Sequence, residues 1–133
     1  MSRRWFLKKI AALVGLSAAA PVIQASPSRS LVQPIELQRS KLAGFQYHQG
    51  EVVWSMLTVG TALNLIREPD NRHDARAVRV DWQGHKLGYV PRIDNAAVSH
   101  LLDNGQSVRA EIAVLQVSDD PWKRVGITIY LGG

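Results

Sequence analysis

The side chains best suited to chemistry gather in one short segment, REPDNRHD, which runs from Arg67 to Asp74. Asn71, His73 and Asp74 supply an amide, an imidazole and a carboxylate, and arginines lie among them. Such groups can bind nucleic acid, because arginine neutralises phosphates and flat rings stack on bases. They can also catalyse, because His73 and Asp74, together with His48, could form an acid–base pair. The segment is therefore the candidate site, for binding or for catalysis.

Catalysis is the weaker of these two hypotheses. The chain has no cysteine, which excludes disulfides, thiolate zinc sites and a cysteine nucleophile. It also lacks a serine in a nucleophile elbow, paired carboxylates at a plausible spacing and a glycine-rich phosphate loop. The four histidines are scattered without the spacing of metal ligands: His48, His73, His85 and His100. We therefore expect no catalytic residue, no cofactor and no metal site.

Two apolar strands must position the candidate loop. Alternation over residues 63–66 breaks at the loop and resumes over residues 75–80, as expected for strands on either side of it. Residues 81–84, DWQG, predict a short hairpin turn, after which residues 85–90 pair back along residues 75–80. Loops supported by rigid strands are where binding groups usually lie.

One helix is predicted after this hairpin. It opens at Ile93 and Asp94, with Asp94 placed to cap the first amides, and it stops at Asn104 and Gly105. Its apolar stripe would consist of Ile93, Ala96, Ala97, His100 and Leu101. Residues 51–57, EVVWSML, are too few to assign a period, and we expect only that they are buried.

The two ends of the domain are predicted to be strands. We take the second half of residues 35–47 as the first strand, and residues 108–115 and 125–131 as a terminal hairpin. Within that hairpin one face should carry Val108, Ala110, Ile112 and Val114. Several short strands, close turns and one short helix predict a mainly β fold, a small β-barrel.

The loop and the hairpin after it also carry a family resemblance. REPDNRHDARAVRV followed by GHKLGYVPR resembles the HIRAN domain, written as REP-x-N-x-x-D-x-x-A-[IV]-x-V and G-x-x-[IVL]-G-Y-[IVL]-P. The resemblance extends more weakly over residues 42–113, including the aromatic segment GFQYH at residues 44–48. It implies an OB/SH3-like barrel and a module of DNA-repair and chromatin-remodelling proteins that captures the 3′ end of single-stranded DNA. Phosphoanhydride hydrolysis and zinc, where the family is associated with them, belong to its large multidomain hosts.

The resemblance and the loop chemistry together suggest ten nucleic-acid-binding residues: Phe45, Tyr47, His48, Arg67, Asn71, Arg72, His73, Asp74, Lys86 and Arg92. The family implies that the rings stack on end bases and that Asp74 accepts a hydrogen bond from the terminal hydroxyl. The arginines and the lysine would neutralise phosphates. His73 occupies a loop position that is often tyrosine in the family, so its stacking would depend on pH.

These candidates also have purely structural alternatives. Asn71 and Asp74 could close their own loop, since such side chains bond backbone amides in turns. Arg67 could form a solvated ion pair with Glu68. Tyr89 could be a half-buried barrel aromatic, preceded by a glycine that allows close backbone approach.

The N-terminal segment SRRWFLKK, at residues 2–9, resembles a twin-arginine signal of the bacterial Tat export pathway. An alanine-rich apolar stretch too short to span a bilayer stably follows it, and cleavage is expected after Ala25. We expect residues 1–25 to be a signal peptide, residues 26–34 a linker and residues 35–133 a HIRAN-like β-barrel domain, exported to the periplasm by the Tat translocase. The alternatives are an N-terminal amphipathic helix that is retained and an uncleaved membrane anchor.

The net charge says little about the ligand. The whole chain carries +5, but residues 26–133 hold 12 basic and 11 acidic side chains and so net only +1. The high pI therefore reflects the leader more than the domain. The leading hypothesis is a non-catalytic module that binds single-stranded DNA or DNA ends. The alternative is an exported protein-interaction domain that retains the fold without binding DNA.

Replacing both Arg3 and Arg4 by lysine should retain the protein in the cytoplasm, because the arginine pair defines a Tat signal. Cell fractionation of the parent and the double variant measures this. Equal export of the two proteins, or a parent that stays in the cytosol, would exclude the Tat assignment.

Overall fold

The computed structural model describes residues 33–132 of the chain. The predicted signal peptide and most of the predicted linker lie outside the described residues. Within residues 33–132, no helix is both long enough and apolar enough to cross a membrane.

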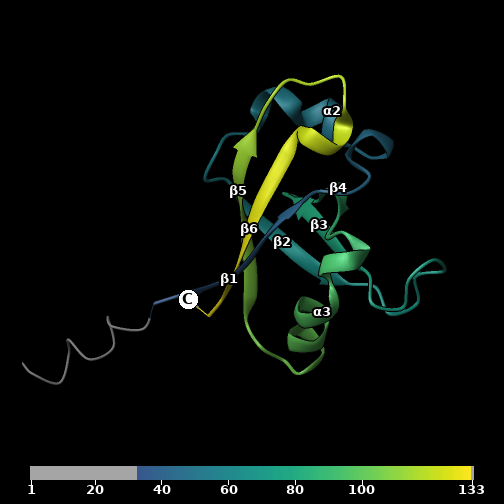
Figure 1. The fold of residues 1–133 in the computed structure, drawn as a ribbon, viewed down its shortest axis with the longest axis vertical. Coiled ribbons are helices and arrows are strands. Elements are labelled where there is room, and N and C mark those ends of the chain that lie inside the picture. Colours follow the sequence, from purple (N-terminus) through teal and green to yellow (C-terminus); the bar gives the residue numbers. More distant parts are fainter. Residues whose placement is uncertain (1–32, 133) are drawn as a thin grey trace, which may run out of the picture. The chain divides into compact units, whose positions relative to one another are not determined.

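The described residues form six antiparallel strands in the order β1-β6-β5-β2-β3-β4 (Figure 1). The strands are β1 (Ile35–Lys41), β2 (Ala62–Arg67), β3 (Val78–Trp82), β4 (His85–Tyr89), β5 (Val108–Leu115) and β6 (Val125–Leu131). Helices α2 (Gly50–Val53) and α3 (Ala96–Asp103) lie at opposite ends of the domain in Figure 1. The predicted mainly β, OB-like class is confirmed, although the sheet is not closed into a barrel and there is one helix more than expected.

Apolar side chains from β2 to β6 meet the two helices in a common core. Its fully or almost fully buried members include Leu42, Phe45, Val53, Leu63, Val78, Val80, Leu87, Val98, Ala110, Ile112, Val125, Ile127 and Ile129. The segment of unassigned period contributes Val53 and Leu57 to the core. Its predicted burial is confirmed for these two residues and is wrong for Val52 and Met56, which are 75% and 55% exposed. The burial of so much apolar surface stabilises the domain without disulfides.

The first strand lies in the first half of residues 35–47, so its prediction in the second half is wrong. Gly44 adopts a left-handed conformation with φ 75° and precedes a 3-10 turn, Phe45–Tyr47. Phe45 is completely buried in this turn, whereas Tyr47 is 78% exposed. One short turn thus provides both a core anchor and an exposed ring.

The predicted hairpin between β3 and β4 is confirmed, with a tighter turn than expected. Asp81 and Trp82 belong to β3, and the loop consists of Gln83 and Gly84, with φ 45° and 82°. Positive φ at both loop residues matches the right-handed twist of the flanking strands.

The predicted helix exists but begins later than the sequence pattern indicated. Ile93 lies in a preceding 3-10 turn, Arg92–Asp94, and is 87% exposed. The predicted apolar stripe is wrong, because Ala96, Ala97 and His100 are also exposed and the helix buries Val98 and Ser99 instead. Asn95, not Asp94, occupies the N-cap position. The predicted stop is confirmed, because Gly105 has φ 76° and the amides of Gly105 and Gln106 bond back to helix carbonyls, as in a Schellman motif.

A bulge in β5 overturns part of the predicted alternation. Ile112 pairs with Ile127 and Val114 with Gly126, which leaves Ala113 as an extra residue between them. Because one extra residue reverses which face the following side chains point to, Val114 is 47% exposed while Ile112 is 1% exposed.

A pair of backbone hydrogen bonds connects the two edges of the sheet. After β1 ends, Ala43 and Tyr89 exchange N–H to O=C bonds, both 2.9 Å long. A Cβ on the neighbouring Gly88 would lie 2.3 Å from the Ala43 carbonyl oxygen. The expected role of this glycine in a close backbone approach is therefore confirmed, and the approach brings the aromatic turn beside β4.

Ile112→Ala should lower the free energy of unfolding by about 2–5 kcal/mol, because it leaves a cavity in the core. Val114→Ala, two residues along the same strand, is the matched control and should cost less than about 1 kcal/mol. Urea unfolding of both variants measures the difference. Similar losses for the two would contradict the bulge.

Candidate functional site

The loop between β2 and β3 projects from the sheet (Figure 1) and is held by the Asn71 side chain. Its Oδ1 accepts hydrogen bonds from the backbone amides of His73 (2.8 Å) and Asp74 (3.1 Å). Its Nδ2 donates to Glu68 Oε1 at 3.0 Å. The structural alternative is therefore confirmed for Asn71, because its side chain closes its own loop.

The Asp74 carboxylate has a donor on each oxygen. Oδ1 accepts from the backbone N–H of Arg76 at 2.9 Å, and Oδ2 accepts from the Asn95 side-chain amide at 2.7 Å. The Arg76 amide bond, assisted by Asn95 and the positive charge of Arg92, lowers the pKa of Asp74 despite partial desolvation. The carboxylate is thus ionised at neutral pH and acts as an acceptor with lone pairs to spare.

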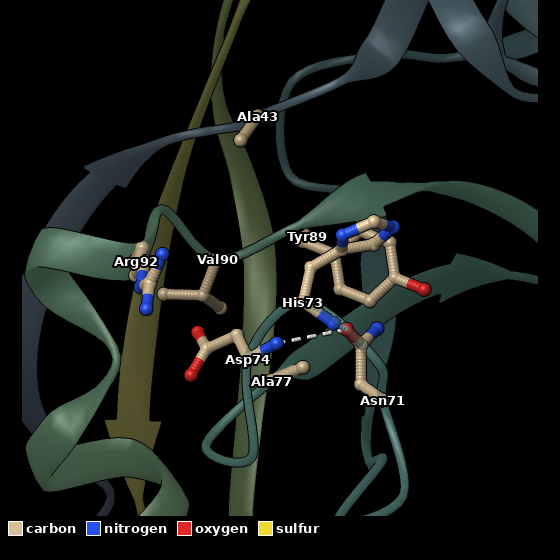
Figure 2. A pocket seen from close by; sticks show the side chains of 8 residues that line it. All are labelled: Ala43, Asn71, His73, Asp74, Ala77, Tyr89, Val90 and Arg92. Carbon is tan, nitrogen blue, oxygen red and sulfur yellow. Dashed lines mark hydrogen bonds between the residues drawn. The ribbon is translucent and has the colours of Figure 1, made fainter.

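Asp74 lines a pocket of about 260 Å³. Figure 2 draws its lining residues, which are Ala43, Asn71, His73, Asp74, Ala77, Tyr89, Val90 and Arg92. In this view Asp74 lies between Arg92 and Val90 on one side and His73 and Asn71 on the other. The pocket therefore combines apolar walls and two ring side chains with one anion and one exposed cation.

Glu68 connects the loop to the hairpin. It accepts hydrogen bonds from Tyr89 Oη (2.7 Å), from Asn71 and from an Arg79 guanidinium nitrogen (3.1 Å). Burial opposes its ionisation, but the Tyr89 and Asn71 hydrogen bonds and the charges of Lys86 and Arg79 outweigh that and lower the pKa of Glu68. Arg79 also makes two bonds to Asp81. This network fixes Tyr89 at the border of the pocket.

Two predicted binding residues turn out to be structural. Phe45 is completely buried and packs edge-on against Trp54, with ring centroids 5.7 Å apart, so it cannot stack on a base. Arg67 makes two bonds to Asp103 (2.8 and 3.2 Å) and donates to the carbonyls of residues 75 and 77. Its charge is already paired, and the partner is not Glu68 as the sequence suggested.

A second hollow has a volume of about 560 Å³, and two of its lining residues, His48 and Lys86, contact the Tyr89 ring of the first pocket. Its lining is Tyr47, His48, Gln49, Arg79, Asp81, Gly84 and Lys86. The His48 ring meets Tyr89 edge-on at 5.8 Å, and Lys86 Nζ lies 4.6 Å from the centre of the Tyr89 ring. Desolvation and the nearby Lys86 charge lower the pKa of His48, although Glu68 opposes the shift. His48 is therefore neutral at pH 7.

Three of the predicted phosphate-binding cations remain available. Arg92 and Arg72 are exposed, and Lys86 is half-buried beside Tyr89. Arg92 lies at the first pocket and Lys86 at the second hollow. Among residues 33–132, no three histidine, aspartate or glutamate side chains come together as metal ligands would.

Sequence reasoning missed three residues that organise the site: Glu68, Arg79 and Asn95. Glu68 is expected from the sequence only as part of a solvated ion pair. Arg79 and Asn95 lie within a predicted strand and a predicted helix and give no signal of their own. A half-buried charged pair cannot be recognised without knowing which strands adjoin. Tyr89 was correctly expected to be half-buried, but not to line the pocket that contains Asp74.

The family model of the HIRAN domain matches residues 35–132. The chain is similar to a solved protein from Lactobacillus plantarum, with 27% identity and a TM-score of 0.66, covering 75% of this chain and 96% of that one. It also resembles the HIRAN domain of human HLTF in fold, with 18% identity and a TM-score of 0.59, covering 74% and 76% of the two chains. No curated protein matches the sequence.

Lys86→Met should raise the pKa of His48, because it removes a positive charge that disfavours the imidazolium form. NMR titration of the histidine ring protons measures this shift, and the wild-type value should lie below 6.5. Lys123→Met, which removes a cation that does not contribute to the shift of the His48 pKa, is the control and should leave His48 unchanged. An unshifted His48 in the Lys86 variant would mean that the two side chains are not neighbours in solution.

Proposed function

The chain belongs to the HIRAN domain family, and we propose that it binds single-stranded DNA at a free 3′ end and catalyses no reaction. Membership in this family supports nucleic-acid binding in general. The terminal nucleotide would occupy the pocket lined by Asp74, and the preceding ones would run past Tyr89 toward Tyr47.

The observation that carries this proposal is the fixed, ionised carboxylate of Asp74 at the edge of a pocket with apolar walls. An ionised carboxylate only accepts hydrogen bonds, so it suits a hydroxyl group. It would repel a phosphate in the same position. A pocket with this acceptor therefore favours a strand that ends in a free hydroxyl over one that ends in phosphate.

The rings around the pocket fit a single strand better than a duplex. Tyr47 is 78% exposed and offers a flat surface on which a base can stack, whereas bases in a duplex already stack on one another. Such stacking is worth about 1–3 kcal/mol per base and tolerates any sequence. His73, which lines the same pocket, would form a second, smaller ring contact.

The available cations imply modest and salt-sensitive affinity. Arg72, Lys86 and Arg92 could each neutralise a phosphate, whereas Arg67 and Arg79 are already paired with acids. Three phosphate contacts on a single strand correspond to a slope of about −2 for log affinity against log salt. We expect binding that relies on the end contact more than on charge.

The alternative is an exported domain that binds a protein. The nearly neutral charge of residues 26–133 and the pairing of several arginines favour it, as does the Tat-like leader. Export to the periplasm is itself proposed on the leader sequence alone. Under this alternative the fold is retained and the end preference is absent.

Asp74→Ala should weaken binding of an oligonucleotide with a free 3′ hydroxyl and should not weaken binding of a 3′-phosphorylated one, which the carboxylate repels. Loss of a hydrogen bond to a charged acceptor is worth about 1.5–3 kcal/mol, so the preference should fall about tenfold or more. Asp74→Asn keeps the side-chain shape and should lose the preference as well. Fluorescence anisotropy with the two oligonucleotides measures the ratio.

Tyr47→Ala should lower the affinity for both oligonucleotides alike, because stacking ignores the chemistry of the end. Trp122→Ala removes another exposed ring, 42% exposed, which lines neither hollow, and should change neither affinity. If the unmodified protein binds no single strand in a salt-sensitive way, the nucleic-acid proposal fails and the protein-binding alternative replaces it.

A further inference from the structure

Asn95 lies at the N-terminus of α3, but its side chain does not cap that helix. It stands at the N-cap of α3, where an asparagine side chain normally accepts a hydrogen bond from the first amides. Within the described residues its side chain makes no such bond, and its backbone is already helical, with φ −93° and ψ −3°. Only 1% of the residue is exposed. Its amide is therefore enclosed by protein without capping the helix.

The amide group is instead directed at the binding loop. Nδ2 donates to Asp74 Oδ2 at 2.7 Å, across 21 positions of the chain. Oδ1 is buried and has no hydrogen-bond partner among the described residues. A buried acceptor without a partner destabilises a folded protein. Folding alone would therefore be served better by a capping residue that is fully satisfied.

Asn95 differs from the other donor to Asp74. The Arg76 amide belongs to the same loop as Asp74, so it moves with that loop. Asn95 belongs to the segment that joins the turn at Arg92–Asp94 to α3, and Val98 and Ser99 of that helix are buried. Hydrogen bonds from a rigid, buried neighbour fix the direction of a binding group. Asn95 is thus the contact that ties the carboxylate to the body of the domain.

We propose that Asn95 is a positioning residue that holds the Asp74 carboxylate, ionised and in one orientation, for a free terminal hydroxyl. This inference rests on the proposed function. It adds that selectivity for the hydroxyl end is set by a buried amide on another element, outside the loop and the pocket lining. The Arg76 amide and the Asn95 side chain each donate to one oxygen of Asp74. The carboxylate keeps further lone pairs and can accept a hydrogen bond from a hydroxyl.

The test compares Asn95→Ala with Asn104→Ala in the full-length protein. Asn104 caps the other end of α3, where its side chain donates to the His100 carbonyl at 2.7 Å and does not touch Asp74. Asn95→Ala should reduce the preference for a 3′ hydroxyl over a 3′ phosphate about tenfold and raise the pKa of Asp74, measured by carboxyl NMR without DNA. Asn104→Ala should change neither quantity.

Asn95→Asp tests the same contact in a way that depends on pH. Two carboxylates at this separation cannot both ionise easily. At a pH high enough to ionise both, the end preference should be lost. On acidification one of them takes up a proton and can donate it to the other, so the preference should return in part. Circular dichroism shows whether Asn95→Ala folds. If it does not, Asn95→Asp replaces it in the comparison.

The outcomes separate the two proposals. A wild-type protein that prefers the hydroxyl end, with an Asn95→Ala variant that keeps the full preference, would overturn the role of Asn95 alone. A wild-type protein without any end preference would overturn the proposed function, and the positioning role with it. An Asn104→Ala variant that loses the preference as strongly as Asn95→Ala would show that helix stability, not positioning, controls the site.

Discussion

The backbone exchange between Ala43 and Tyr89 is the constraint on which the site depends. It draws the segment after β1 against β4, and a side chain larger than hydrogen at residue 88 would collide with the Ala43 carbonyl. The 3-10 turn that follows Ala43 then carries His48 to the face of β4, where its ring meets Tyr89. The same contact that joins the edges of an open sheet thus joins the aromatic turn to the binding loop.

Charge pairing inside the domain leaves few groups for a ligand. Arg67 is committed to Asp103, Arg79 to Glu68 and Asp81, and Arg124 to Glu51 beside the Trp54 ring. These pairs hold the loop, the hairpin and α2 in place, so their charges add little to the attraction of an anion. A ligand of this surface must therefore be recognised by shape, rings and hydrogen bonds more than by overall potential.

The loop between β2 and β3 satisfies its own polar groups before any ligand arrives. Asn71 bonds two amides of the loop, Asp74 bonds the Arg76 amide, and Glu68 anchors the loop to Tyr89. A loop that is already ordered loses less conformational entropy on binding. Asn71 and Asp74 can therefore be structural and functional at once, and the two interpretations of the motif do not compete.

The sequence by itself determined the mainly β class, the β3–β4 hairpin and the glycine stop of α3, because strand alternation and turn chemistry are local properties of the chain. It also determined the family, because the motif is a continuous run of residues. Only the tertiary structure decided that Phe45 is buried while Tyr47, two residues later, is exposed, since that depends on where the turn meets the core. It also decided the partners of Arg67 and Asp74, which lie 36 and 21 positions away. Pairings at such separations depend on how the elements pack, which no local pattern records.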